Sequence, residues 1–589
     1  MVDAVTTEIL RNRLDAIATQ MQVTLLKSAV SVVIKEGEDC ACCLFRSNGA
    51  LVAQSCANPI QLAIMGPAME AVLRRFPAET MQTGDVYVLN DPYTGGTHIP
   101  DLIMVSPVIV DGAVIALSAA LAHQEDFGGK SFGSMPANAT EIFQEGLILP
   151  PVALYIADKR NETLFDILTH NVRMPESLLG DMGAQLASVK LGVRAFLLAV
   201  EEMGAGTIIE AMDVLFEQAE GLMRRGIEQI PDGDYDFYDF IDNDGLELDR
   251  RIRIEGKISI RGSDALVDFT NSSPQVRGPI NVGYWGAYSA ATFAFRAFTD
   301  LDIPSNAGAT RPIKMIAPEG SILNPRHPAP VGLRTTTAKR ILDVLYGALA
   351  KAVPKRAVAA SSGCLSVCSF GGTDSNGQLY GCTDLVAGGM GGRPGKDGID
   401  LVDTDITNTM NIPVEAFEAR FPLRVLKTRY RADSGGPGEF RGGLGVQRSI
   451  QVTQGPIRCS YRSDRHFTRP WGINGGGAGE SFATRILRVD GSVQAIPSKQ
   501  DFVLETGDIL EVLTGGGGGY GDPLARAFEK VADDLIDRKL TPEAAERDYA
   551  VIGDVDGIDV DASLALRAAR RKERGPISWT IDRGNGTRE

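Results

Sequence analysis

The chain has 589 residues, of which 44% are hydrophobic and 23% charged, with 65 glycines and 30 prolines. This composition excludes a disordered chain and a collagen, and the length predicts about three or four domains with a sizeable core. The 59 Lys and Arg residues against 75 Asp and Glu leave a formal net charge of −16, which repels nucleic acid and anionic membrane surfaces, so neither is expected as a partner.

The sequence also favours a cytoplasmic location. Asp3 and Glu8 stand where a signal peptide needs an apolar run, and the most apolar stretch, 102–122, is interrupted by Pro107 and a turn. No membrane span is therefore expected. The 8 cysteines do not have the spacing of a disulfide framework, so we expect reduced thiols.

Hairpins dominate the predicted N-terminal region. The apolar spacing from Leu10 to Leu25 predicts an amphipathic helix. A strand, an Asn-Gly turn and a second strand follow, so that Asp39 opens a hairpin. A helix at 60–76 and a strand at 85–90 come next, and a second hairpin at 104–121 delivers His123 at its end.

The rest of the chain divides into further predicted units. We expect a helical pair at 175–225, strands at 231–271, helices at 284–298 and 335–353, a charged helical segment at 524–551 and a poorly anchored tail. The predicted fold is α+β, a multi-domain mixed α/β chain with a hairpin-rich, metal-binding N-terminal region and a Gly-rich, β-rich C-terminal third. Its domains are an N-terminal metal-site region (1–174), a helical segment (175–230), a mixed α/β middle domain (231–359), a Gly-rich β domain (360–525) and a C-terminal helix with a tail (526–589).

Histidine is scarce, with 5 residues in the chain, so its placement is informative. His98 stands three residues before Asp101, and His123 closes the second hairpin, so two imidazoles and one carboxylate can converge there. This is a common ligand set for a divalent cation with an open position, and Asp39 could add a fourth oxygen. The alternative is that the two histidines never meet, because so short a spacing often matches by accident.

Two other segments partly match known motifs, a phosphate-binding loop and a calcium-binding loop, but lack residues that those motifs require. The sequence at 391–396 ends like a phosphate-binding loop, but Met390 and Asp397 occupy positions that require Gly and Ser or Thr. ATP binding by such a loop is therefore not expected. The acidic stretch 239–245 lacks the ligand spacing of a calcium loop and is interpreted as a solvated turn.

Cysteine chemistry and glycine runs leave alternatives open. Cysteine nucleophiles lack a local base, so buried structural thiols are the preferred interpretation of Cys42, Cys43 and Cys364.

The long glycine runs allow positive φ and close backbone approach, as in tight turns of a β-rich domain or at the border of a ligand or a partner protein. These runs lie at 434–445, 471–479 and 514–523. Between two of them, Arg462, Asp464 and Arg465 are interpreted as an internal charge pair, with recognition of a substrate carboxylate as the alternative.

Long ordered blocks carry a resemblance over nearly the whole chain. These blocks are 39–45 with 49–54, 84–101, 122–129, 133–146 and the three glycine runs. In them the sequence resembles the hydantoinase B family, which contains N-methylhydantoinases, 5-oxoprolinases and the related acetone and acetophenone carboxylases.

The resemblance implies a hetero-oligomeric, two-component enzyme. In it a hydantoinase A-like component binds ATP and phosphorylates a carbonyl oxygen of a small-molecule substrate, which the B-type component then processes at a metal site. The metal ligands of the family map onto His98, Asp101 and His123, with Asp39 as a further ligand, and the cation expected is zinc, manganese or iron. The leading hypothesis is an ATP-dependent cyclic amidohydrolase that opens a hydantoin, lactam or 5-oxoproline-like ring, and the alternative is a component of a ketone carboxylase.

Carboxylates within the matching blocks are candidates for catalysis. Asp126, Glu141 and Glu145 could orient a ligand or act as general base, although each could equally be a capping or solvated group. Gln61 and Gln124 stand where many relatives carry histidine, so a mechanism that needs a second imidazole beside His123 is not supported by this chain.

Overall fold

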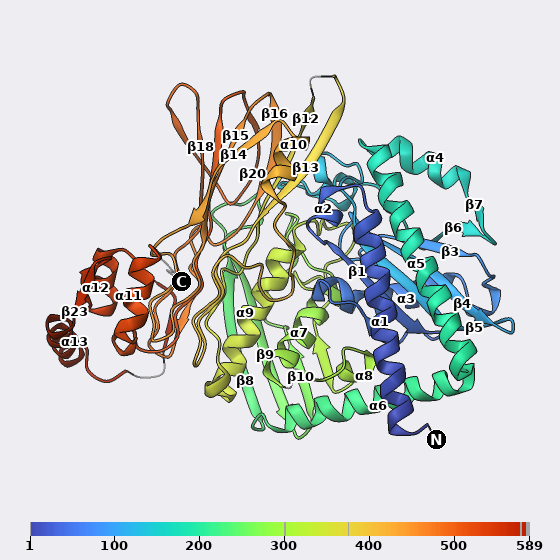
Figure 1. The fold of residues 1–589 in the computed structure, drawn as a ribbon, viewed down its shortest axis with the longest axis horizontal. Helices are drawn as coiled ribbons and strands as arrows, with labels where there is room; N and C mark the ends of the chain where they lie inside the picture. Colours follow the sequence, from blue (N-terminus) through green and yellow to red (C-terminus); the bar gives the residue numbers. More distant parts are fainter. Residues whose placement is uncertain (1, 300–301, 375, 578–579, 585–589) are drawn as a thin grey trace.

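The N-terminal part is built around one antiparallel sheet in the order β2-β1-β5-β4-β3-β6-β7 (Figure 1). The computed structural model describes residues 2–299, 302–374, 376–577 and 580–584. The strands of this sheet are β1 Cys40–Arg46, β2 Leu51–Gln54, β3 Val86–Leu89, β4 Asp101–Val110, β5 Ala113–His123, β6 Val152–Ile156 and β7 Lys159–Arg160.

The central hairpin β4–β5 is longer than predicted. Asp111 and Gly112 both have positive φ, as a two-residue hairpin turn of the primed type requires. Most of both strands is buried on both faces because helices cover the two sides. The helices α1 Ala4–Ser28 and α5 Pro175–Met203 pack on one face, and α3 Pro59–Arg75 packs on the other.

One helix has the length and apolar character of a membrane span. This helix is α5, and 44% of its most apolar window is buried within the protein. It packs against α1, β4 and β5, as a core helix does. With α6 Ala205–Glu228 it forms the predicted helical pair.

A second sheet lies beside the first and has the order β11-β10-β9-β8. Its strands are β8 Gly233–Ile241, β9 Ile252–Arg261, β10 Asp264–Asp268 and β11 Ile313–Ile316. The helix α9 Arg334–Ala352 packs on β8 and β9, and α7 Tyr284–Phe298 packs on α9. Side chains from Arg334 to Ala350 are almost all buried, so α9 is a central helix whose first residues face the N-terminal sheet. Two short helices complete these parts, α4 Glu162–Asn171 and α8 Ala307–Thr310.

Two further sheets form the predicted β-rich C-terminal third and share one hydrophobic core (Figure 1). The first has the order β13-β12-β16-β20 and the second β14-β15-β21-β18-β19. Their strands are β12 Ser366–Thr373, β13 Leu379–Val386, β14 Leu423–Tyr430, β15 Val446–Val452, β16 Ile457–Arg462, β18 Ala483–Leu487, β19 Val493–Ile496, β20 Lys499–Leu504 and β21 Ile509–Leu513. The short helices α2 Val32–Lys35 and α10 Val414–Arg420 flank them.

The glycine runs lie against one another as a layer of backbone. The amide of Gly443 donates to Met390 O (2.7 Å), that of Gly517 to Gly443 O (2.9 Å) and that of Gly436 to Gly517 O (2.8 Å). Within the three runs only Gly475 and Gly521 are glycines with positive φ. Close approach of the backbones, rather than turn geometry, is therefore what most of these positions require.

Gly517→Ala is expected to destabilise this layer. An added Cβ would lie 2.1 Å from the carbonyl oxygen of Met390, and neighbouring backbone cannot yield as a flexible side chain can. Overpacking of this kind costs about 1–3 kcal/mol, and more where backbone must move. Gly183→Ala is the control, because it lies in α5 with nothing within 4 Å of the added carbon, where alanine stabilises a helix by about 0.5–1 kcal/mol. Urea unfolding of both variants checks this, and equal midpoints would contradict it.

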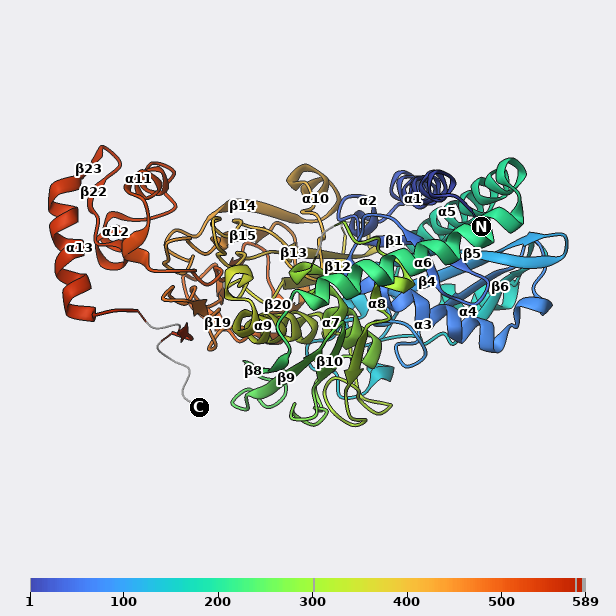
Figure 2. The ribbon, with the colours of Figure 1, turned by 90° about the horizontal axis from the view of Figure 1, so that it is seen from below.

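The C-terminal residues are better anchored than predicted. The helices α11 Phe528–Ile536, α12 Pro542–Tyr549 and α13 Val560–Arg574 form a small unit with its own core, which projects from one end of the molecule (Figure 2). Beyond it, β24 Ile581–Asp582 pairs with β17 Gly472–Ile473. Arg583 then donates to Asp239 Oδ1 at 3.0 Å. For residues 580–584 the prediction of a loose tail is wrong, because these contacts join residues that are far apart in the sequence. Residues 578–579 and 585–589 of the predicted tail lie outside the described residues.

The acidic stretch 239–245 is buried and does not form a solvated turn, which corrects that prediction. Asp242 is 1% exposed and accepts the backbone amides of His466 (2.6 Å), Phe467 (3.0 Å) and Thr468 (3.0 Å). A carboxylate that satisfies three backbone donors belongs in the interior. The donors come from a segment more than 200 residues away, so no local pattern reveals them.

A network of buried charges joins the middle sheet to the C-terminal third. Arg340 lies at its centre and donates to Asp239 (3.1 Å) and Asp464 (3.0 Å). Arg465 binds Asp239 at 3.2 Å and Asp343 at 2.6 Å. The segment 462–465, predicted to hold an internal charge pair, has two internally paired members. Asp464 pairs with Arg340 and Lys499, and Arg465 pairs with Asp239 and Asp343, whereas Arg462 forms no ion pair within the described residues.

Candidate metal centre

Three strand ends bring the predicted metal ligands to one edge of the N-terminal sheet. Asp101 begins β4 and His123 ends β5, and the two are direct partners in the antiparallel register. Asp39 immediately precedes β1, and its carbonyl accepts the amide of His123 at 3.0 Å. His98 lies in the loop before β4. Antiparallel pairing places the start of one strand beside the end of its neighbour, so these residues converge.

The ligand atoms face one another at short distances. His98 Nε2 lies 3.1 Å from His123 Nδ1 and 3.3 Å from Asp101 Oδ1. His123 Nδ1 lies 3.2 Å from Asp101 Oδ1 and 3.8 Å from Asp39 Oδ2. The three residues His98, Asp101 and His123 are all buried and form a possible metal site.

Outer partners fix each ligand. The Asp101 carboxylate accepts a hydrogen bond from Arg334 Nη2 (2.8 Å) and another from the Thr97 hydroxyl. Asp39 Oδ1 accepts from Asn58 Nδ2 (2.8 Å) and Gln61 Nε2 (2.6 Å). Such partners hold a ligand side chain in the orientation that a metal needs.

The electrostatic environment keeps the imidazole of His98 neutral and the carboxylate of Asp101 ionised. Burial, together with the Arg334 cation, lowers the pKa of His98 to about 3. Burial opposes ionisation of Asp101, but His98 and Arg334 outweigh it and hold the pKa of that carboxyl well below its usual range. Burial raises the pKa of Asp39, against the effect of His123. A neutral imidazole is the form that binds a metal.

The positions of His98, Asp101 and His123 fit a divalent cation. Two ligands at about 2.1 Å from a tetrahedral ion are about 3.4 Å apart, and the distances of 3.1 to 3.3 Å among His98, His123 and Asp101 are close to that value. His98 Nδ1 lies 3.4 Å from Gly332 O, so the tautomer with Nδ1–H directs the Nε2 lone pair inward. Two nitrogens and a carboxylate oxygen suit zinc, manganese and iron alike.

The centre borders a small cavity of about 80 Å³. Asp39, His98 and His123 form part of its wall, and α9 contributes its first residues. The opposite wall comes from the sheet that contains β12, β13 and β16. The side chains that line the cavity from this sheet are mainly apolar and include one guanidinium. They belong to Leu365, Val367, Thr383, Leu385 and Arg462.

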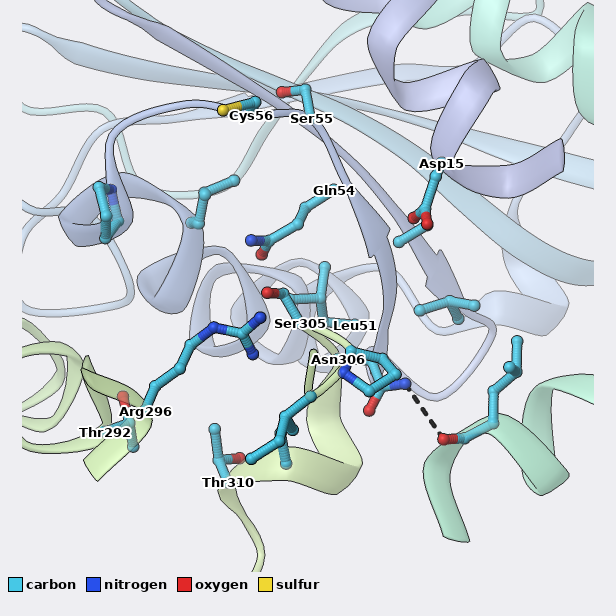
Figure 3. Close-up of a pocket in the computed structure, with 18 of the residues that line it drawn as sticks. Asp15, Leu51, Gln54, Ser55, Cys56, Thr292, Arg296, Ser305, Asn306 and Thr310 are labelled. Atoms are coloured by element: carbon cyan, nitrogen blue, oxygen red, sulfur yellow. Dashed lines mark hydrogen bonds between the residues drawn. The ribbon is translucent and has the colours of Figure 1, made fainter. Parts of the chain in front are cut away.

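A larger cavity of about 820 Å³ lies on the other side of the segment 54–62. Figure 3 shows Arg296 and Gln54 extending toward its middle from different walls, with Thr292 and Thr310 on the α7 and α8 side. Residues 54–57, Pro59 and Leu62 line this cavity, whereas Asn58, Ile60 and Gln61 line the smaller one. The two cavities therefore share one wall.

The structure separates the three carboxylates that are predicted to act in catalysis. Asp126 binds Arg173 Nη1 at 2.6 Å and caps the amide of Gly128, so its contacts are not with the metal ligands. Glu141 is exposed and precedes a short turn of 3₁₀-helix. Glu145 is fully buried and accepts the amides of Val331 and Gly332 at 3.2 and 2.7 Å. Of the three, Glu145 is the one that approaches the centre, through Gly332.

Gln61 and Gln124 have different surroundings. Gln61 touches Asp39, and its Oε1 is buried without a hydrogen-bond partner. Gln124 points away from the centre and donates to Gln185 Oε1 on α5 at 3.0 Å. Neighbouring residues point to opposite sides of an extended chain, which is why His123 reaches the centre and Gln124 does not.

The cysteines near the centre are structural, as predicted. Cys42, Cys43 and Cys364 are buried, and burial raises the pKa of Cys42 and of Cys364 to about 12. Burial also raises the pKa of Cys43 well above its ordinary value. A thiol of this kind is protonated at neutral pH and is a poor nucleophile.

Three residues of the centre could not be found from the sequence, Arg334, Gly332 and Asn58. Arg334 and Gly332 follow His98 by more than 200 residues, and no local spacing links them to it. Asn58 precedes the Pro59 that begins α3, where it resembles any residue before a helix. From the hairpin pattern, only the positions of Asp39 and His123 at strand ends could be inferred.

Comparison with known proteins identifies the family of this chain. Residues 3–523 match the family model described as hydantoinase B/oxoprolinase. The B component of a proposed D-/L-hydantoinase from Pseudomonas sp. (strain NS671) is 34% identical over 587 residues, which cover 96% of this chain and 98% of that protein.

Two solved structures are also similar. The crystal structure of an ATP-dependent caprolactamase from Pseudomonas jessenii has a TM-score of 0.89 and 28% identity, covering 96% of this chain and 100% of that one. A nucleotide-free acetone carboxylase structure has a TM-score of 0.89 at 20% identity over 97% of this chain and 83% of that one, which shows a shared fold. From the match over residues 3–523, this chain is a member of the hydantoinase B/oxoprolinase family.

Proposed function

We propose that this chain is the B-type component of an ATP-dependent cyclic amidohydrolase. It would open a lactam, hydantoin or 5-oxoproline-like ring that a hydantoinase A-like partner has phosphorylated. The observation that carries the proposal is the cluster of His98, Asp101 and His123 at the wall of a cavity, in a chain that aligns along its length with a hydantoinase component and a caprolactamase.

The chemistry explains why two components are needed. Amide resonance makes the carbonyl carbon of a lactam a weak electrophile, and phosphorylation of its oxygen removes that resonance and creates a leaving group. A divalent cation held by Asp39, His98, Asp101 and His123 supplies Lewis acidity, which makes water a stronger acid and polarises a carbonyl or phosphoryl oxygen.

The chain itself supplies orientation and a shielded site. Arg334 and Thr97 hold Asp101, while Asn58 and Gln61 hold Asp39, so the donors are set before a cation arrives. The apolar side chains of the opposite wall, Val367 among them, limit access of bulk water. Electrostatic interactions are stronger in such surroundings than in water.

Glu145 is proposed as a positioning residue of this site. It accepts the amides of Val331 and Gly332, and the carbonyl of Gly332 faces His98 Nδ1. Through this peptide it sets the hydrogen bond that selects the tautomer of His98. It does not line the cavity, so it is not placed as a general base.

Glu145→Gln is expected to flatten the pH dependence of stability. Burial raises the pKa of Glu145 to about 8 in the folded protein, against the effect of the two amides. Because the folded pKa is raised, the contribution of Glu145 to stability is complete below the ordinary pKa of about 4.3 and is lost as the pH rises through about 8. Between those two pH values, the free energy of unfolding of the wild type falls by up to about 1.4 kcal/mol per pH unit more than that of the variant. Urea unfolding at several pH values tests this, and parallel profiles for the two proteins would contradict it.

The function is tested with the complex of this chain and its hydantoinase A-like partner. The assay follows ADP and ring-opened product with hydantoin, 5-oxoproline and caprolactam, beside acetone with bicarbonate. We expect ring opening that needs both components and ATP. Carboxylation of acetone without opening of any ring would contradict the proposal, as would ring opening by this chain alone without ATP.

A further inference from the structure

Arg462 is a buried cation without a carboxylate partner. It ends β16, and the whole residue is 3% exposed. Its guanidinium donates to the carbonyl of Met135 and to the Ser369 hydroxyl (2.9 Å), both uncharged acceptors, and its Nε has no partner. Among the residues that the structure describes, no carboxylate forms an ion pair with it. Burial lowers the pKa of Arg462 to about 10, against the attraction of the Asp501 carboxylate, which forms no ion pair with it.

Six other buried arginines among the described residues each pair with a carboxylate. The carboxylates that pair with them lie within 4.0 Å in each case, as for Arg334, Arg340, Arg441, Arg448, Arg465 and Arg526. Arg567, in the C-terminal helical unit, also lacks a carboxylate, but its guanidinium lies 4.1 Å from the ring centroid of Phe528. A buried charge without a counterion costs free energy, so an uncompensated one beside a cavity points to a ligand.

The register of the sheet directs Arg462 into the small cavity. Val367 pairs directly with both Leu385 and Arg462 across neighbouring strands. Direct partners lie on the same face of a sheet, and all three side chains line the cavity. That cavity also contains His98, His123 and Arg334 in its wall, and the Nε of Arg334 has no partner either.

We propose that Arg462 is the oxyanion-binding residue of this cavity, where it takes a negatively charged oxygen of the substrate, with Arg334 as the second cation. The inference rests on the proposed function and names the substrate class of the same site. The oxyanion has two possible sources, the phosphoryl group that the partner adds to the ring oxygen and a carboxylate that the substrate itself carries. Arginine donates to both through a planar fork.

The test uses Arg462→Met and Arg462→Lys in the full chain, with Arg458→Met as the control. Arg458 lies on the same strand and is exposed. Calorimetric titration with inorganic phosphate and with 5-oxoproline measures binding, and the metal content and Tm are measured beside it. We expect Arg462→Met to weaken binding of at least one probe by about tenfold or more, with Arg462→Lys between it and the wild type. Metal content should stay unchanged, and Tm should not fall, because the lost cation has no counterion.

The possible outcomes distinguish the two sources of the oxyanion, and they test the subsite separately from the proposed function. Weaker binding of phosphate assigns the subsite to the phosphoryl group, and weaker binding of 5-oxoproline alone assigns it to a substrate carboxylate. Unchanged binding of both probes, or a chain that unfolds on losing the charge, overturns the proposal and makes Arg462 structural. If phosphate binding depends on Arg462 but the complex opens no ring, the proposed function fails and the subsite stands. If the Arg462→Met complex opens the ring as fast as the wild-type complex does, the proposal of an oxyanion subsite is contradicted, whereas the proposed function is retained.

Discussion

His98→Ala is expected to remove the bound divalent cation and to reduce ATP-coupled ring opening by more than about 100-fold. The imidazole lies within 3.3 Å of two other ligand atoms, and loss of even an outer partner of a metal ligand costs about 10–100-fold. His123→Ala should behave in the same way. The measurement is the metal content of purified protein by mass spectrometry, beside turnover of the complex.

His170→Ala is the matched control for this experiment. His170 is exposed at the end of α4 and bonds to the carbonyl of Asp166 at 2.7 Å. Its replacement should leave metal content and turnover unchanged. Full metal occupancy in both His98→Ala and His123→Ala would show that these histidines do not hold the cation.

Arg340→Met is expected to have the largest effect on stability. Arg340 is fully buried between Asp239 and Asp464, and Asp343 lies beside it. Removing the cation leaves buried carboxylates near one another, which typically costs about 3–5 kcal/mol. The midpoint of urea unfolding should fall accordingly.

An exposed ion pair serves as the comparison for Arg340. Arg250 pairs with Glu247 at 3.1 Å, and both side chains are about half exposed. Surface pairs contribute about 0–1 kcal/mol, so Arg250→Met should leave the midpoint almost unchanged. If Arg340→Met were equally mild, the buried network would not be what joins the middle sheet to the C-terminal third.

The fold and the core of the site were predictable where the signal is local. Periodicity placed α7 at 284–298 with no error in its bounds, and hairpin patterns put Asp39 and His123 at strand ends. The local spacing left open whether His98 and His123 meet. The resemblance to relatives implied a shared metal site, and the structure brings His98, Asp101 and His123 together.

What could not be predicted depends on contacts between distant segments. Arg334 reaches Asp101 from a helix that begins 233 residues later, and Asp242 is buried because the amides of 466–468 surround it. The sequence left open whether the glycine runs form tight turns or border a ligand or a partner protein, and the structure shows them packed backbone against backbone. Such contacts are properties of the folded chain, and no spacing in the sequence encodes them.

X-ray absorption at the edge of the bound metal tests most directly whether Asp39, His98, Asp101 and His123 hold one divalent cation. We expect a first shell of nitrogen and oxygen at about 2.0–2.2 Å that includes two imidazoles, with no sulfur. A shell with sulfur at about 2.3 Å would place the cation on cysteines such as Cys40 instead, and a shell without imidazole would contradict the site altogether.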